Sequence, residues 1–153
     1  MRSPQVVRAV VRAVAADPTA AIIVQFEAKV NANMYVGITT LQSADYPLGS
    51  RIYEFVFGGW GNTFSVIRSG PQAPTAGDVA TPSSPCNATV FLPFWVSLTF
   101  GGTAFMGGTA AGEQVLLTWS DPFPFIGNQD LIVGFSTWDW YATVRNVQVI
   151  STA

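Results

Sequence analysis

Residues 57–70, FGGWGNTFSVIRSG, place three glycines around a tryptophan and end in an arginine and a further glycine. Three kinds of structure use such a combination: a loop that cradles a phosphate, a platform on which a sugar stacks, and a tight turn between strands. A phosphate loop needs a helix after it, because the helix N-terminus provides the free amides. The residues that follow, TFSVIR, alternate and therefore predict a strand. The phosphate interpretation is disfavoured.

Three side chains of this stretch are candidates for ligand contacts, namely Trp60, Asn62 and Arg68. The glycines are expected to supply positive φ or close backbone approach, and Asn62 to hydrogen-bond the turn. Trp60 is either a lid on the core, which we favour, or an exposed ring on which a sugar or a partner side chain stacks. Arg68 is expected to pair with a carboxylate such as Glu54 rather than to contact a ligand. Further candidates for stacking are Trp138 and Trp140.

The sequence contains few side chains of the types that catalyse reactions. The chain has no histidine, which excludes Ser-His-Asp, Cys-His and histidine-metal sites. Cys86 is the only cysteine, so an internal disulfide is excluded, and we favour a partly buried free thiol over an intermolecular bridge. Asp121, Asp130 and Asp139 are more typical of turns at strand ends than of a carboxylate pair. We therefore expect a non-enzymatic protein without cofactor or metal.

Charge and composition limit the partners. Residues 13–153 carry four basic and nine acidic groups, so a nucleic acid, which needs clustered cations, is not expected. Only 10% of the residues are charged and 49% are hydrophobic, where about a quarter charged is ordinary. Some apolar surface is therefore expected to be covered by partner chains, by glycans or by a bound ligand.

The hydrophobic pattern has period 2 over most of the chain, which predicts strands. In residues 22–30, IIVQFEAKV, the apolar side chains from Val24 to Val30 alternate with Gln25, Glu27 and Lys29. The longest uncharged span, residues 79–112, is long enough to cross a bilayer. Pro93 and a Gly-Gly pair divide it into strand-length pieces, so we expect a hairpin and no membrane span. The alternating pattern and this hairpin together predict an all-β, antiparallel, jelly-roll-like sandwich over residues 19–153.

Residues 69–89, SGPQAPTAGDVATPSSPCNAT, contain four prolines and predict a long surface loop within this domain. The loop ends in Asn87-Ala88-Thr89, which matches the acceptor for N-glycosylation. Its accessible hydroxyls are candidates for O-linked sugars. These candidates are Thr75, Thr81, Ser83 and Ser84. An extracellular or cell-surface glycoprotein is expected.

Several motifs in order give a family resemblance. The motifs are IYEFVFGGWGNTFSVIR, FWVSLTFGGTAFMGG, LLTWSDPFP and LIVGFSTWDW, which span roughly residues 21–150. Together they resemble the farnesoic acid O-methyltransferase domain family. The resemblance implies a β-sandwich module that is often found in secreted or cell-surface proteins. The strand-only pattern does not predict the α/β nucleotide fold that methyl transfer usually needs, so activity as an enzyme of that name is the least favoured function.

The N-terminal arm, residues 1–18, is rich in valine and arginine. Its pattern fits a helix or a strand, and the valines favour the strand. Such a strand either pairs with its own sheet or completes the sheet of a neighbour, and repeated donation would build a filament. The expected assembly residues are Val6, Val7, Arg8, Val10, Val11, Arg12 and Val14. The leading functional prediction is therefore a self-associating structural module, with a carbohydrate-binding module as the alternative.

Overall fold

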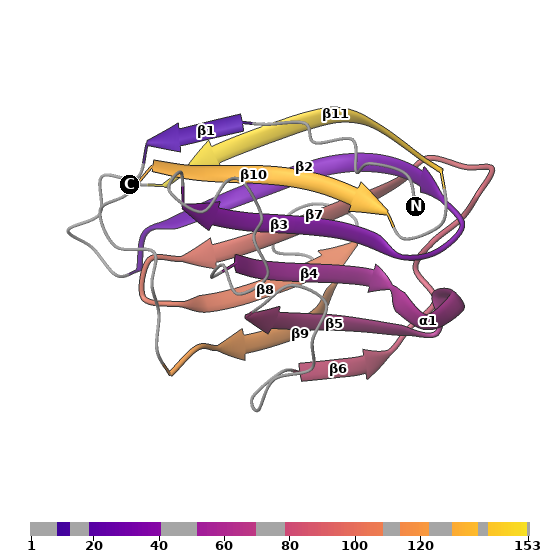
Figure 1. The fold of residues 1–153 in the computed structure, drawn as a ribbon, viewed down its shortest axis with the longest axis horizontal. Coiled ribbons are helices and arrows are strands. Elements are labelled where there is room, and N and C mark those ends of the chain that lie inside the picture. The colour runs from indigo at the N-terminus through magenta and orange to yellow at the C-terminus, as the bar shows by residue number, and fades with distance from the viewer. Residues whose placement is uncertain are drawn as a thin grey trace.

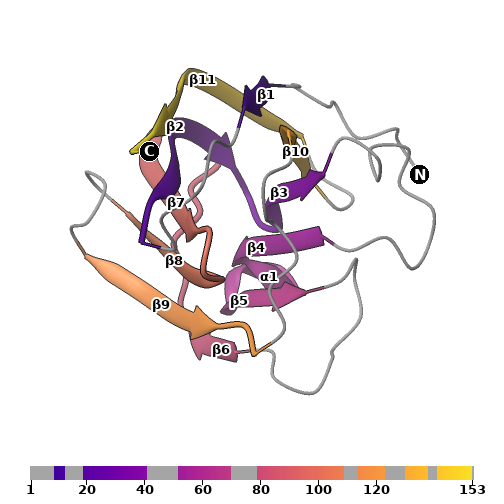
Figure 2. The same cartoon turned by 90° about the vertical axis from the view of Figure 1, so that its left-hand side faces the viewer.

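The computed structural model describes residues 9–12, 19–40, 52–69, 79–108, 114–122, 130–137 and 141–152. They form two antiparallel sheets packed face to face, as Figures 1 and 2 show. The six-stranded sheet has the order β1 (Ala9–Arg12), β10 (Asp130–Thr137), β3 (Met34–Thr40), β4 (Ile52–Gly58), β5 (Phe64–Ser69) and β6 (Val79–Pro82). The five-stranded sheet has the order β11 (Ala142–Ser151), β2 (Ala21–Val30), β7 (Leu92–Thr99), β8 (Thr103–Gly108) and β9 (Val115–Ser120). The predicted antiparallel β-sandwich is confirmed.

The period-2 pattern places the side chains of the strands as predicted. In β2 the alternate residues from Ile22 to Val30 are buried, whereas Gln25, Glu27 and Lys29 are half-exposed on the outer face. Strand β4 is buried on both faces, because Tyr53 belongs to the core and Glu54 on the opposite face is only 4% exposed. The six-stranded sheet is therefore covered on its outer side at this strand, while the five-stranded sheet has an accessible outer face.

An aromatic cluster joins the two sheets in the core. The ring of Phe26 on β2 lies 4.9 Å from that of Phe135 on β10 and 5.6 Å from that of Phe94 on β7, between centroids. Phe57 on β4 contacts Phe94 at 4.9 Å in an edge-to-face arrangement. Such pairs stabilise a core beyond their buried area by about 0.5–1.5 kcal/mol each. These contacts join the two sheets across the core.

The long uncharged span forms the predicted hairpin. Strands β7 and β8 pair antiparallel, with Val96 opposite Met106. Within the described ranges, no helix has the length and hydropathy needed to cross a bilayer.

Two strands lie where the sequence did not predict them. Strand β3 was not predicted, and β6 occupies part of the predicted loop 69–89, where it pairs with β5. Strand β1 confirms that residues 9–12 of the arm are extended, and it pairs with β10 of the same chain. Residues 9–12 of the predicted arm therefore lie in the sandwich's own sheet.

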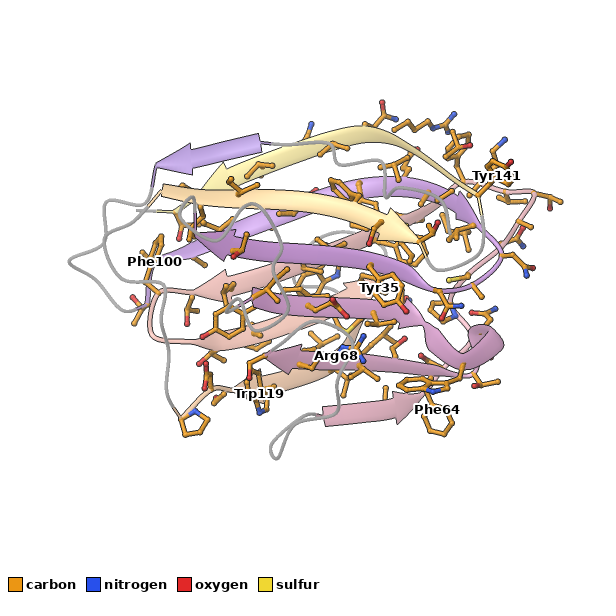
Figure 3. All side chains as sticks on the ribbon, in the orientation of Figure 1. Tyr35, Phe64, Arg68, Phe100, Trp119 and Tyr141 are labelled. Atoms are coloured by element: carbon orange, nitrogen blue, oxygen red, sulfur yellow. The ribbon has the colours of Figure 1, made fainter. Side chains whose placement is uncertain are left out.

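Several turns and connecting segments lie together at one end of the sandwich. It holds α1 (Gly59–Asn62), the turn between β2 and β3, the segment 83–91 and Tyr141, which precedes β11. We call this the α1 end. Figure 3 shows Phe64 and Tyr141 at this end and Phe100 at the opposite one. The antiparallel order of the strands brings together residues that lie far apart in the sequence.

Candidate functional site

Exposed apolar side chains gather at the α1 end. Of the large hydrophobic residues that are exposed in the described ranges, four belong to it: Trp60, Phe64, Val90 and Tyr141. Val115 and Ile150 lie elsewhere on the five-stranded sheet. Tyr141 is 73% exposed and Trp60 63% exposed. Apolar side chains concentrated in this way mark surfaces that bind a ligand or a partner.

Trp60 stands on a single left-handed helical turn. The φ angles are 62° at Gly58, 50° at Trp60, 70° at Gly61 and 66° at Asn62. The amide of Thr63 donates a hydrogen bond of 3.0 Å to the carbonyl of Gly59 and so closes the turn. A tryptophan in this conformation costs about 1–2 kcal/mol, because Cβ approaches the following carbonyl oxygen. Backbone strain of this kind persists only where the surroundings determine the conformation.

Hydrogen bonds from neighbouring segments determine this conformation. The side chain of Asn62 accepts a bond of 3.0 Å from the amide of Cys86 and donates one of 3.1 Å to its carbonyl. The amide of Asn33 donates to the carbonyl of Gly58 at 2.8 Å. The hydroxyl of Thr63 donates to the carbonyl of Trp60 at 2.8 Å. The turn is thus tied to two neighbouring segments, the turn between β2 and β3 and the segment 83–91, which hold the backbone that carries Trp60.

The predicted roles within this stretch hold in part. Glycines are required at positions with positive φ, as expected, and Asn62 hydrogen-bonds the turn. The favoured interpretation of Trp60 as a lid on the core is wrong, because the left-handed turn directs the side chain into solvent. Its ring meets that of Phe64 edge to face, with the centroids 6.3 Å apart. This leaves a rigid aromatic surface at the end of the sandwich.

Arg68 has the predicted partner and lies apart from Trp60. Its Nε donates to Oε1 of Glu54 at 2.8 Å, and its Nη2 contacts the same oxygen. Both side chains are buried. The pair lies across β4 and β5 near the end of β5 that is remote from the turn (Figure 3). Arg68 therefore has a structural role and does not join Trp60 and Asn62 in one site.

A second group of residues at the α1 end went unrecognised in the sequence. Nζ of Lys29 lies 4.6 Å, and Cζ of Arg145 3.7 Å, from the centroid of the Phe91 ring. Nε of Arg145 also donates to Oε2 of Glu27 at 3.0 Å, and Asn146 donates to both oxygens of that carboxylate. The hydrogen bonds from Asn146 and then Arg145 lower the pKa of Glu27. No motif signals this group, because its members come from three distant segments.

The segment 83–91 connects the two groups. The amide and carbonyl of Cys86 bond to Asn62, and the carbonyl of Asn87 accepts a bond of 2.9 Å from the amide of Val30. Burial raises the pKa of the Cys86 thiol to about 11, so this thiol is protonated at neutral pH. Cys86 is half-buried, as predicted.

The glycosylation candidates differ in accessibility. Asn87 is exposed, and its Oδ1 accepts bonds from the amides of Thr89 and Val90 and from the Thr89 hydroxyl. Ser84 is exposed, and Thr81 on β6 is half-exposed. The hydroxyl of Ser83 is 2.5 Å from that of the buried Ser65, which makes it the least available of the candidates that the structure describes.

Several predicted residues cannot be placed. Of the predicted assembly residues in the arm, Val10, Val11 and Arg12 are described, and only through their backbone. The other predicted residues that lie outside the described ranges are Val6, Val7, Arg8, Val14, Thr75, Trp138 and Trp140.

The described members of the aspartate trio lie at strand ends, as predicted. Asp121 follows β9 and accepts a hydrogen bond of 2.6 Å from the hydroxyl of Tyr53. Asp130 is the first residue of β10, and Asp139 lies outside the described residues. The described ranges hold no group of three or more acidic or thiol side chains that could bind a metal ion.

The comparison with protein families decides the assignment. The model for farnesoic acid O-methyltransferase matches residues 9–147. The chain belongs to this family. The match includes β1 and so begins earlier than the range of about 21–150 that the sequence motifs indicated. No curated protein matches this chain.

Solved structures with the same fold are remote in sequence. Sheep galectin-11 in complex with glycerol has a TM-score of 0.52 and 10% identity, with 94% of this chain and 99% of that chain covered. The homodimeric agglutinin CG-16 from chicken liver has a TM-score of 0.51 and 13% identity, with 89% and 99% covered. A β-glucanase from Bacillus licheniformis has a TM-score of 0.52 and 9% identity, with 88% and 66% covered. These likenesses show the sandwich fold alone.

Proposed function

We propose that this family member is a non-enzymatic, extracellular carbohydrate-binding module whose ligand stacks on Trp60. The observation that carries the proposal is the exposed ring of Trp60 on a strained turn that hydrogen bonds from two neighbouring segments hold in place. The galectins and the agglutinin share its fold, which makes the proposal compatible with the scaffold. Because identity to them is low, the proposal rests on this chain's own residues.

The chemistry of the site suits a sugar. The apolar face of a pyranose packs flat against an indole ring, and Phe64 extends the aromatic surface beside Trp60. A ring that is already held in place loses little conformational entropy when a ligand binds. The strain at Trp60 is therefore explained if its side chain must point outward and stay there.

Removing the ring should weaken binding without harming the fold. We expect Trp60→Ala to weaken glycan binding by about tenfold to a hundredfold, since a stacked aromatic contact contributes roughly 1–3 kcal/mol. Trp60→Gly should weaken binding equally and keep or raise the free energy of unfolding, because glycine relieves the left-handed strain. A glycan array followed by titration of the best ligand measures the first effect, and urea denaturation the second.

A control at the same end makes this test specific. Val90→Ala removes an exposed apolar side chain near the turn without an aromatic face. It should leave binding unchanged. If the parent protein binds no glycan, or if Trp60→Ala binds as well as the parent, the proposed function is wrong.

Export and glycosylation are part of the same proposal. Asn87 is exposed at the surface of the α1 end, where an attached glycan would cover apolar side chains such as Val90. Native material is expected to have an intact mass above the 16.3 kDa of the bare chain, with the excess removed by a glycosidase specific for N-linked sugars. A bare chain in secreted material would contradict glycosylation.

Self-association through the arm is the second candidate function. It is favoured by β1, a strand of only four residues that pairs with β10 alone at the edge of its sheet. A short edge strand next to a connecting segment is suited to exchange with the same strand of a second copy.

Deletion of residues 1–16 tests the exchange. We expect the truncated chain to stay folded, since ten described strands remain, and to sediment as a monomer where the parent sediments as an oligomer. The double substitution Val7→Asp with Val11→Asp should have the same effect without removing the backbone. A parent that is already monomeric, or a truncated chain that still assembles, would show that the arm does not mediate assembly.

A further inference from the structure

The few basic residues of the chain are unevenly distributed. Residues 13–153 contain only Lys29, Arg51, Arg68 and Arg145 as basic groups against nine acidic ones. Arg68 is buried with Glu54, and Arg51 lies outside the described residues. The two accessible cations that the structure describes, Lys29 and Arg145, contact the same ring, Phe91. Within the described part of residues 13–153, the accessible cations of this acidic chain thus lie together at the α1 end.

The charges of Lys29, Arg145 and Glu27 do not cancel. Arg145 pairs with Glu27, whereas no carboxylate within the described ranges pairs with Lys29. Nζ of Lys29 and Cζ of Arg145 lie 4.6 Å and 3.7 Å from the same ring centroid. The two positive charges are therefore close enough to repel each other. Cation–π contacts and one carboxylate only partly offset this repulsion. An anion bound by both cations would offset this repulsion and would also pair with Lys29.

The register of the strands shows what surrounds the cations. On the outer face of the five-stranded sheet, Thr143 lies opposite Lys29 and Arg145 opposite Glu27. Tyr141 precedes Thr143 by two residues at the same edge and is 73% exposed. A ring for apolar contact therefore lies at the same edge of the sheet as the two cations, at the end of the molecule that also holds Phe64 (Figure 3).

We propose that Lys29 and Arg145 bind the acidic group of an anionic glycan, either a carboxylate or a sulfate ester, with Tyr141 contacting the sugar that carries it. The inference rests on the proposed carbohydrate-binding function and names its ligand class. Segment 83–91 supports one continuous surface, since Cys86 is tied to the turn of Trp60 and Asn87 to the end of β2. The planar guanidinium of Arg145 is suited to two oxygens of one acidic group, and Lys29 adds a point charge.

Two pairs of polymers test the proposal and distinguish the two acidic groups. The sulfate pair is dextran sulfate with uncharged dextran of the same length, and the carboxylate pair is polygalacturonate with its methyl ester. Protein made in bacteria, without sugar on Asn87, is measured by biolayer interferometry. We expect at least one acidic polymer to bind about tenfold or more tightly than its neutral partner, and the preference to fall with added salt.

Substitutions show whether the two cations cause the preference. Lys29→Gln with Arg145→Gln should remove it, and the exchange Lys29→Arg with Arg145→Lys should keep it. Adding Thr118→Lys and Ser120→Lys to the double glutamine variant restores the net charge on exposed positions of β9. Continued loss of the preference in that variant supports the site, whereas its recovery would show a general charge effect and overturn the proposal.

The outcomes also separate this inference from the proposed function. A parent that binds glycans through Trp60 but binds acidic and neutral polymers equally would overturn only the inference. A parent that binds neither polymer pair nor any glycan of the array would overturn both. Because Lys29 and Arg145 are on the surface, circular dichroism should confirm that every variant is folded.

Discussion

Glu54→Gln is expected to lower the free energy of unfolding by about 3–5 kcal/mol, because it leaves the guanidinium of Arg68 buried without its counter-charge. The two side chains are 4% and 6% exposed, and Arg68 directs both Nε and Nη2 to the same oxygen of Glu54. A charge taken out of water without a partner loses its solvation and gains little in return. Urea denaturation, followed by tryptophan fluorescence, measures the loss.

An exposed pair in the same chain provides the matched control. Glu27 and Arg145 are also directly opposite each other on antiparallel strands, but the Arg145 side chain is half-exposed. Glu27→Gln should leave the denaturation midpoint unchanged within error, because water screens that pair. The double variant Glu54→Leu with Arg68→Met should recover most of the stability that Glu54→Gln loses. Equal effects of the two glutamine substitutions would show that burial does not set the cost.

The fold could be predicted because alternation determines which face of a strand is buried. In β2 the polar positions Gln25, Glu27 and Lys29 must face outward once Phe26 enters the core, so the pattern alone places them. The pairing of Glu54 with Arg68 was also foreseeable, since strands joined by a tight turn place residues at equal distances from it opposite each other.

Strands β3 and β6 show where pattern reading is weak. Val79–Pro82 contains a proline and lies in a stretch rich in serine and threonine, which is typical of a loop, yet it pairs with β5 at the sheet edge, where a missing amide is tolerated. In β3, Gly37 and two threonines interrupt the apolar run of MYVGITT. Tertiary pairing overrides local propensity in both cases.

The site was less predictable than the fold. A glycine-rich turn implies positive φ but does not say in which direction its tryptophan points, and Trp60 faces solvent because three consecutive residues are left-handed. Lys29, Phe91 and Arg145 meet only because β11 and the residues before β7 flank the end of β2. Single-sequence reasoning has no access to such long-range register.

Gly58→Ala is expected to cost about 2–5 kcal/mol and to displace the turn that carries Trp60. An added Cβ would lie 2.4 Å from Oδ1 of Asn62 and 2.6 Å from Sγ of Cys86. Neither atom can withdraw freely, because Oδ1 accepts the amide of Cys86 and Sγ donates to the carbonyl of Phe57. The left-handed φ of 62° adds strain of its own. Urea denaturation and glycan titration should both register the change.

Gly61→Ala separates strain from collision. Its φ of 70° is nearly that of Gly58, but nothing lies within 4 Å of the added Cβ. Only the strain should remain, at about 1–2 kcal/mol, and the turn should keep its hydrogen bonds to Cys86. Glycan binding by Gly61→Ala should therefore stay close to that of the parent, while Gly58→Ala should bind weakly even at temperatures where it is folded. Equal binding by the two variants would mean that the ligand does not depend on where the turn holds Trp60, since only Gly58→Ala forces Asn62 and Cys86 apart.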